Sequence, residues 1–189
     1  TTLFRSYTEA KGRESAVRYL VLSDSHGNIA NMETAVERER PDGILHLGDC
    51  WRDAERLAER YPDILMEHVP GNCDCRPEEP AEKLLFLGDC RVLLCHGHTY
   101  GVKTSLLAAG LKAEQDRLDA FLFGHTHKPL VDRRGRTLFL NPGSIGTGLR
   151  PTYGILTVGG NRLDGRTVFL DAPAAGHLRV MQTVCHRDG

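Results

Sequence analysis

The chain has 189 residues, a length that suits one domain with a sizeable hydrophobic core. Hydrophobic residues make up 40% of the chain and charged residues 26%, the composition of an ordinary globular protein. The formal net charge is −1, and no apolar run approaches the roughly 18 residues of a membrane span, so neither nucleic acid nor a membrane is expected as a partner.

The first half of the chain predicts a β-α-β-α-β order. Residues 1–16 show no periodicity and are interpreted as an N-terminal extension. The predicted strands that follow are 17–23, 43–47 and 64–69, and the predicted helices between them are 29–39 and 52–60. Asn28 is expected to cap the first helix, and Pro41 is expected to end it. This order is typical of an α/β protein with a parallel sheet.

The second half predicts three hairpins, one helix and one further strand at 120–123. The hairpin strands are 84–87 with 91–95, 129–132 with 137–140, and 153–158 with 167–170. The predicted helix at 103–117 has an apolar face formed by Leu106, Leu107, Ala109, Gly110 and Leu111. No break in composition marks a second domain, so we expect one domain over residues 17–171 and a C-terminal tail over 172–189.

The six cysteines favour a reducing, cytoplasmic location. Cys50, Cys90 and Cys95 lie in or beside apolar strand-like runs, so they are interpreted as small buried thiols. The pair Cys73-Asp-Cys75 lacks the spacing of a zinc knuckle. The first residues are polar and charged, unlike a secretory signal, which agrees with the cytoplasmic interpretation.

Residue types that ligate metals follow five of the predicted strands. They are Asp24 and His26, Asp49, Asn72, His96 and His98, and His125 and His127. Because the sites of α/β sheets lie at the carboxyl ends of the strands, we expect these side chains to converge. Each one alone has an ordinary explanation as a turn former or an exposed histidine, but five compatible strand ends make coincidence a poor account. The other histidines are interpreted as structural, namely His46, His68, His177 and His186.

All of these donors except His98 are candidate metal ligands. Divalent metals favour their mixture of carboxylate, amide oxygen and imidazole. Seven ligands exceed what one metal takes from protein, and they suit two metals that share one carboxylate, about 3.5–4 Å apart. Such a pair lowers the pKa of a water and neutralises charge on phosphoryl oxygens during an in-line displacement. No thiolate is required, which argues against a structural zinc site.

The complete set of motifs resembles that of the calcineurin-like metallophosphoesterase superfamily. In the superfamily's order, the motifs are Asp24-x-His26, Gly48-Asp49, Gly71-Asn72, His96-Gly-His98 and Gly124-His125-x-His127. The later Asn141-Pro-Gly-Ser144 resembles the small bacterial and archaeal phosphodiesterase branch, to which the retromer subunit of eukaryotes, a scaffold protein, is also similar. The resemblance covers residues 17–170 and implies a four-layer αββα sandwich with its site at the strand ends.

The resemblance also implies a role for each matched position. One metal would be held by Asp24, His26 and His127, a second by Asn72, His96 and His125, and both by Asp49. Larger relatives carry a histidine after the asparagine, where it acts on the leaving group, and this chain has Cys73 there. The candidate catalytic residues are Asn72 and His98, the nearest imidazole outside the ligand set. Because the histidine is missing, substrates with good leaving groups are favoured. Asp74 is expected to hydrogen-bond a metal-site histidine.

These expectations together predict a binuclear-metal phosphoesterase that hydrolyses phosphodiesters, with phosphomonoesters as further candidates, by attack of a metal-bound hydroxide. Mn²⁺ is the first expectation for the metal, and Ni, Fe, Zn, Co and Mg are the alternatives. The expected partner is a small phosphoester, and association into homo-oligomers is left open. The alternative is a catalytically silent scaffold of the same fold, which the presence of His26 disfavours. A nucleic-acid module would need a basic stripe with interleaved aromatic residues, which is not found.

Overall fold

The structure is a computed structural model that describes residues 16–75 and 79–171. The predicted N-terminal extension, apart from residue 16, and the predicted C-terminal tail lie outside these residues, as do residues 76–78. The predicted domain boundaries therefore stay predictions. Within the described ranges, no helix is long and apolar enough to cross a membrane.

The first of two β-sheets contains the predicted β-α-β-α-β unit. Its elements are β1 (Val17–Leu22), α2 (Ile29–Glu39), β2 (Gly43–His46), α3 (Trp51–Arg60) and β3 (Leu65–His68). The three strands are parallel, and β9 (Thr152–Gly159) and β10 (Arg162–Phe169) extend the sheet on the other side of β1 as an antiparallel hairpin. The backbone N–H of Asn31 donates to Asn28 Oδ1 at 3.2 Å, which confirms Asn28 as the cap of α2.

The second sheet has the strand order β4-β5-β6-β8-β7. Its elements are β4 (Glu82–Leu87), β5 (Cys90–Cys95), the 3₁₀ turn η1 (His98–Tyr100), α4 (Leu107–Gln115), β6 (Ala120–Leu122), β7 (Leu130–Arg134) and β8 (Thr137–Asn141). Strands β5, β6 and β8 are parallel neighbours, whereas β4 and β7 pair antiparallel at the edges. The hairpins predicted around residues 88–89 and 135 are thus confirmed.

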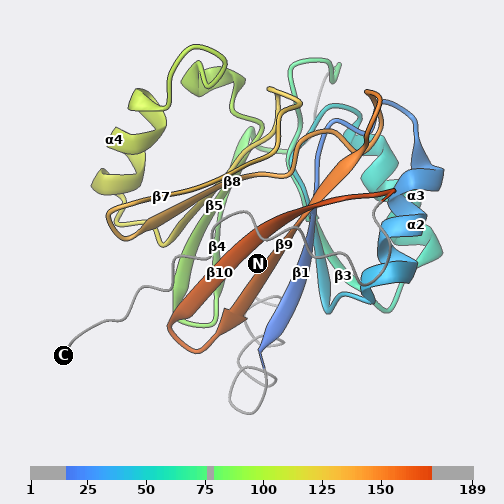
Figure 1. Cartoon of the computed structure of the whole chain (residues 1–189), viewed down its shortest axis with the longest axis horizontal. Helices are drawn as coiled ribbons and strands as arrows, with labels where there is room; N and C mark the ends of the chain where they lie inside the picture. Colours follow the sequence, from blue (N-terminus) through green and yellow to red (C-terminus); the bar gives the residue numbers. More distant parts are fainter. Residues whose placement is uncertain (1–15, 76–78, 172–189) are drawn as a thin grey trace.

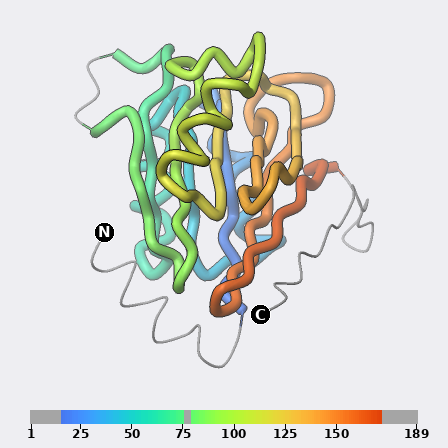
Figure 2. The backbone as a smooth tube through the Cα atoms, turned by 90° about the vertical axis from the view of Figure 1, so that its left-hand side faces the viewer, coloured from blue at the N-terminus to red at the C-terminus, as the bar shows by residue number. Residues whose placement is uncertain are grey.

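Three hydrophobic cores hold four layers together. The central core lies between the two sheets and includes Val21 and Leu94. A second core, which includes Met32, packs α2 and α3 on the outer face of the first sheet, and a third packs α4 on the second sheet through Ala109 and Phe121. The helices accordingly flank the paired sheets on opposite sides in Figure 1, and α4 lies in front of the second sheet in Figure 2. The predicted αββα sandwich is therefore confirmed.

Two predicted elements differ from the structure. The helix predicted at 103–117 is shorter, because η1 and a turn precede α4. Its predicted apolar face is wrong for Leu107 and Leu111, which are 69% and 60% exposed, while Ala109 and Ala113 are buried. Small side chains on the inner face let α4 approach the sheet closely. The strand predicted at 167–170 begins earlier, at Arg162, because a two-residue turn joins β9 directly to β10.

Candidate metal centre

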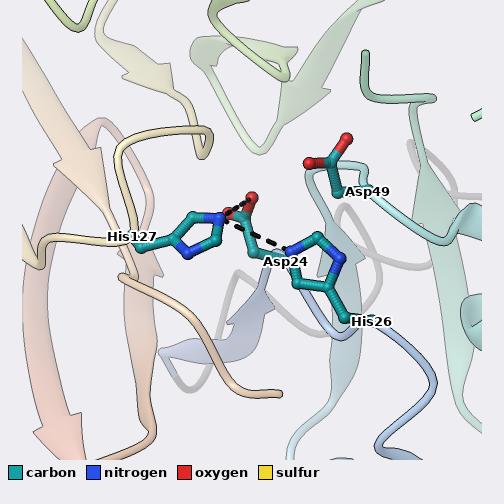
Figure 3. A group of neighbouring side chains, drawn as sticks. All are labelled: Asp24, His26, Asp49 and His127. Carbon is teal, nitrogen blue, oxygen red and sulfur yellow. Dashed lines mark hydrogen bonds and ion pairs between the residues drawn. The ribbon is translucent and has the colours of Figure 1, made fainter. Parts of the chain in front are cut away.

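The candidate site lies at the carboxyl ends of the parallel strands of both sheets. The donors follow β1 (Asp24, His26), β2 (Asp49), β3 (Asn72), β5 (His96, His98) and β6 (His125, His127). The two sheets pack face to face, so five loops from both sheets meet at one edge. Figure 3 shows four of these side chains, with His26 and His127 turned toward Asp24 from either side. The structure thus brings together donors that are up to 103 positions apart in the chain.

The backbone at the site is held in an unfavourable conformation. Positive φ angles of 45–66° occur at Asp24, His26, Asp49, His125 and His127. Side chains other than glycine rarely adopt this region, and such residues persist only where the surrounding structure restrains them. The restraint here includes backbone hydrogen bonds between loops. Asp24 N–H donates to the Gly48 carbonyl at 2.9 Å, and the Asp24 carbonyl accepts from Gly146 N–H. Positions with this kind of strain cluster at functional sites.

Two glycines in the motifs are required by close approach between loops. A Cβ on Gly71 would lie 2.1 Å from Asp49 Oδ1, and a Cβ on Gly124 would lie 1.9 Å from Ser23 Oγ. Neither position has space for a side chain, so glycine is needed for the loops to meet. This explains physically why the asparagine and the first histidine of these motifs follow glycine.

The first group of donors consists of Asp24, His26, Asp49 and His127. One ligand atom from each lies within 4.8 Å of the others. Nε2 of His127 is 3.1 Å from Asp24 Oδ1 and 3.5 Å from Nε2 of His26. Asp24 Oδ1 is buried and has no hydrogen-bond partner within residues 16–75 and 79–171. An unsatisfied carboxylate oxygen beside converging imidazole nitrogens fits a cation, because a cation would satisfy all of these lone pairs at once.

The second group of donors surrounds His96. The Nδ1–H of His96 donates to the Leu47 carbonyl at 2.7 Å, so Nε2 is the ring nitrogen that faces the other donors. This Nε2 lies 3.1 Å from Asn72 Oδ1 and 3.4 Å from Asp49 Oδ1. The ring of His125 is 5.0 Å from that of His96. Nitrogen and oxygen donors therefore face one another here too, and Asp49 belongs to both groups.

The environment of the site shifts the pKa values of its groups. Burial raises the pKa of Asp24. Burial also opposes ionisation of Asp49, but hydrogen bonds from His96 and the Cys73 backbone outweigh it and hold the pKa of Asp49 below its usual range. Burial, together with the nearby charges of His96 and Lys103, lowers the pKa of His125 to about 4. His125 is therefore neutral near pH 7, the state in which imidazole binds metals.

The Asn141-Pro-Gly-Ser144 loop supports two of the ligand-bearing loops. The Asn141 amide donates to the Gly124 carbonyl at 2.7 Å, and the Ser144 hydroxyl donates to the Asp24 carbonyl at 2.8 Å. Thr147 Oγ1 lies 3.3 Å from Nδ1 of His127. The sequence interpretation gave these residues no role. The sequence nevertheless contained a signal for a supporting role, namely a cluster of small polar residues around glycine directly after a strand.

Asp74 does not hydrogen-bond a site histidine, so that expectation is wrong. Its carboxylate accepts from the backbone N–H groups of Cys50 at 2.8 Å, Trp51 at 3.2 Å and Gly71 at 2.7 Å. The first two donors lie at the start of α3, where backbone N–H groups lack partners within the helix and the dipole favours an anion. Asp74 therefore joins the loop after β3 to α3 rather than orienting a ligand.

Cys73 and His98 lie beside the donor groups. The backbone N–H of Cys73 donates to Asp49 Oδ1 at 3.0 Å, and its side chain is exposed. His98 begins η1, and its ring lies 5.5 Å from that of His96 and 6.0 Å from that of His125. Nδ1 of His98 is buried without a hydrogen-bond partner among the described residues. Trp51, the first residue of α3, stacks on His68 with 5.6 Å between ring centroids.

The fold and the paired donor groups define the metallophosphoesterase class of α/β proteins. The profile of the calcineurin-like phosphoesterase superfamily domain matches residues 17–161. The chain therefore belongs to the calcineurin-like phosphoesterase superfamily, as its motifs suggested.

The similar proteins include two bacterial relatives. The chain is 35% identical over 129 residues to "Probable metallophosphoesterase YsnB" of Bacillus subtilis, covering 67% of this chain and 73% of YsnB. It is 27% identical over 168 residues to phosphodiesterase YfcE of Escherichia coli, covering 74% of this chain and 87% of YfcE. Both alignments thus extend over most of each protein.

Two solved structures are similar to the whole sandwich. A predicted phosphoesterase from Streptococcus pneumoniae superposes with a TM-score of 0.70 at 26% identity, covering 83% of this chain and 91% of that one. Vacuolar protein sorting 29 from Cryptosporidium parvum superposes with a TM-score of 0.65 at 17% identity, covering 82% and 97%. The second likeness shows the fold alone.

Proposed function

We propose that this protein is a phosphodiesterase that uses two divalent metal ions. The observation that carries the proposal is the pair of donor groups that share Asp49, each with nitrogen and oxygen lone pairs facing one another. Membership of the superfamily supports a phosphoesterase reaction. The name of YfcE, phosphodiesterase, supports phosphodiesters as the substrate class.

The proposed ligand sets follow the two groups. Asp24, His26 and His127 would hold one ion, Asn72, His96 and His125 the other, and Asp49 both. The ions would supply Lewis acidity, which lowers the pKa of water and neutralises charge on the phosphoryl oxygens. Affinity for the metal depends on availability as well as ligand type, so Mn²⁺ is proposed first, with Ni, Fe, Zn, Co or Mg as alternatives.

The chain itself contributes positioning and hydrogen bonds to the proposed reaction. The Asn72 side chain is exposed at the site, and its Nδ2 donates one N–H to Cys73 Sγ at 3.4 Å. The other N–H can donate to a phosphoryl oxygen while Oδ1 faces His96. His98 is the nearest imidazole outside the ligand set and is partly exposed, so it is proposed to contact the substrate. Asn72 and His98 are accordingly the proposed catalytic residues. The leaving group would depart largely unaided, because Cys73 offers only a thiol, a weak hydrogen-bond donor.

The expected cytoplasmic location stays a proposal that rests on cysteine chemistry. The five cysteines in the described part of the chain, Cys50, Cys73, Cys75, Cys90 and Cys95, all have free thiols. Free thiols are usual where glutathione keeps proteins reduced. Association into homo-oligomers also stays a proposal.

Metal analysis of the purified protein, combined with an activity panel, tests the proposed function. The panel contains aryl phosphodiesters, aryl phosphomonoesters and cyclic nucleotides, each with Mn²⁺ and with Ni²⁺. We expect close to two metal ions per chain and metal-dependent hydrolysis of the phosphodiesters. A chain that binds no metal and hydrolyses none of these esters would instead favour the scaffold alternative, for which the fold of vacuolar protein sorting 29 is the structural precedent.

A further inference from the structure

A buried chain of hydrogen bonds lies directly behind the donor groups. It consists of Ser25, His46 and Asp53, which are 0%, 0% and 3% exposed. Ser25 Oγ lies 2.8 Å from Asp53 Oδ2 and 3.2 Å from His46 Nε2. None of the three belongs to the proposed ligand set, and the sequence interpretation treated His46 as structural.

The hydrogen-bonding direction along this chain is fixed by a backbone donor at His46 and by the carboxylate acceptor of Asp53. The Gly48 N–H donates to His46 Nδ1 at 3.3 Å, so in the neutral ring Nε2 carries the proton and donates to Ser25 Oγ. The Ser25 hydroxyl then donates to Asp53 Oδ2, which also accepts the Gly27 N–H at 2.7 Å. The hydrogen bonds in this series therefore run in one consistent direction, from His46 through Ser25 to Asp53.

This chain joins two of the three loops that carry the first donor group, those after β1 and β2. Ser25 lies between Asp24 and His26 in the loop after β1, and Gly27 follows them. His46 ends β2 and is bonded to Gly48, the residue before Asp49. Asp53 lies in the first turn of α3, which continues from the β2 loop. The carboxylate of Asp53 therefore ties the β1 loop to the element that follows Asp49.

We propose that Ser25, His46 and Asp53 are positioning residues that set the spacing between Asp24, His26 and Asp49, and so determine the affinity of the first metal position. This inference rests on the proposed function. The ligand residues adopt left-handed backbone conformations, which persist only under restraint from neighbouring groups. Metal affinity is sensitive to such supports, and loss of one typically weakens binding by about 10- to 100-fold.

A comparison of Ser25→Ala with Thr137→Val separates positioning from general stability. Both changes delete one buried hydroxyl that donates a hydrogen bond, in the second case to the Leu118 carbonyl at 2.7 Å. Thr137 lies at the start of β8, whereas the end of β8 at Asn141 adjoins the site, so Thr137 is remote from the donors. The measurements are the melting temperature of the metal-free protein, the Mn²⁺ dissociation constant by calorimetry, and kcat and KM for an aryl phosphodiester.

We expect both variants to lower the melting temperature of the metal-free protein, but only Ser25→Ala to raise the Mn²⁺ dissociation constant, by about 10- to 100-fold. Its kcat should fall at limiting Mn²⁺ and recover at high Mn²⁺, with KM unchanged. Equal Mn²⁺ affinity in Ser25→Ala, Thr137→Val and the unsubstituted protein would overturn the inference. Failure of the unsubstituted protein to bind Mn²⁺ would instead refute the proposed function.

Asp53→Asn keeps the inference testable if Ser25→Ala does not fold. Asparagine keeps the volume and one acceptor oxygen of Asp53 but removes the charge that strengthens its bonds from Ser25 and Gly27. We expect weaker Mn²⁺ binding, by roughly 10-fold. An unchanged Mn²⁺ dissociation constant in this variant would count against positioning through Asp53.

Discussion

Asp49 is the residue on which both donor groups depend. Its Oδ1 accepts the Cys73 N–H at 3.0 Å and lies 3.4 Å from His96 Nε2, and its carboxylate is also grouped with Asp24, His26 and His127. The hydrogen bonds that depress its pKa keep it ionised at neutral pH. A negative charge at this position is therefore suited to the proposed pair of cations.

Asp49→Asn is expected to cost more activity than any other single change in the ligand set, by more than about 100-fold, since loss of mere supporting residues already costs about 10- to 100-fold. The amide keeps the shape but supplies no negative charge to either ion. Turnover and metal content are the measurements, with Asp89→Asn in the exposed turn between β4 and β5 as the matched control. Near-normal turnover with near-normal metal content would refute the shared-carboxylate assignment.

Cys73→Ser is expected to keep most of the activity. The hydrogen bond with Asp49, burial and nearby carboxylates raise the pKa of the Cys73 thiol, so little thiolate is present near pH 7 to act as a nucleophile. Cys73→His should instead raise turnover, and most of all for esters with poor leaving groups, because imidazole can donate a proton to the departing oxygen. Turnover of both variants on esters of graded leaving-group pKa tests this. Complete loss in Cys73→Ser, or a cysteinyl-phosphate detected by mass spectrometry, would contradict it.

Among the elements, the loops that follow the strands differ from the helices in how much substitution they tolerate. Gly71 leaves no room for a Cβ, because Asp49 N would lie 2.3 Å away. At Gly110 in α4 a Cβ would meet nothing within 4 Å. The loops are in contact with one another at the site, whereas the middle of α4 has free space on that side.

Gly71→Ala is expected to reduce both stability, by about 1–3 kcal/mol, and metal content. The added methyl collides with Asp49 backbone and side chain, so the loop that carries Asn72 has to move. Urea unfolding and metal analysis measure the two effects. Unchanged metal content would mean that the loop relaxes without displacing Asn72.

Gly110→Ala is expected to stabilise the protein by about 0.5–1 kcal/mol without changing activity. Alanine loses less conformational entropy than glycine when the chain folds into a helix, and no neighbour obstructs its methyl group. Urea unfolding measures the gain, with Gly71→Ala as the contrasting variant. A lower midpoint for Gly110→Ala would show that α4 requires glycine for a reason other than space.

At the scale of the whole molecule, the fold and the site are built from different interactions. The central core between the sheets consists of apolar side chains, including Val21, Leu45, Leu94 and Leu122. The site at the strand ends instead contains buried polar groups, such as Asp24 and His96. Hydrophobic burial therefore holds the sandwich together, and the metal ions are expected to stabilise a structure that already exists.

Exhaustive chelation is accordingly expected to abolish activity without unfolding the chain. A metal at 100 times its dissociation constant would add about 2.7 kcal/mol of stability by mass action, so the metal-free protein should melt earlier but cooperatively. Circular dichroism and thermal melting after EDTA treatment test this, with Mn²⁺ re-addition as the control. Global loss of secondary structure would indicate a structural metal site, as in zinc fingers.

The β-α-β-α-β order, the hairpins and the strand-end position of the donors could be predicted from the sequence. These features depend on short-range properties: short apolar runs, glycine in turns, and Asn28 as a cap. The proposed ligands could be chosen for the same reason, because each follows its own strand within a few residues. Their roles as ligands stay a proposal.

Only the tertiary structure decided which side chains meet. Asp74 binds the start of α3 rather than a histidine, α4 buries Ala109 rather than Leu107, and His46 hydrogen-bonds Ser25 in the loop after β1. Each of these contacts depends on how the strands align in register and how closely the layers pack. Local periodicity does not contain that information, because the partner of a buried polar group is set by elements far away in the chain.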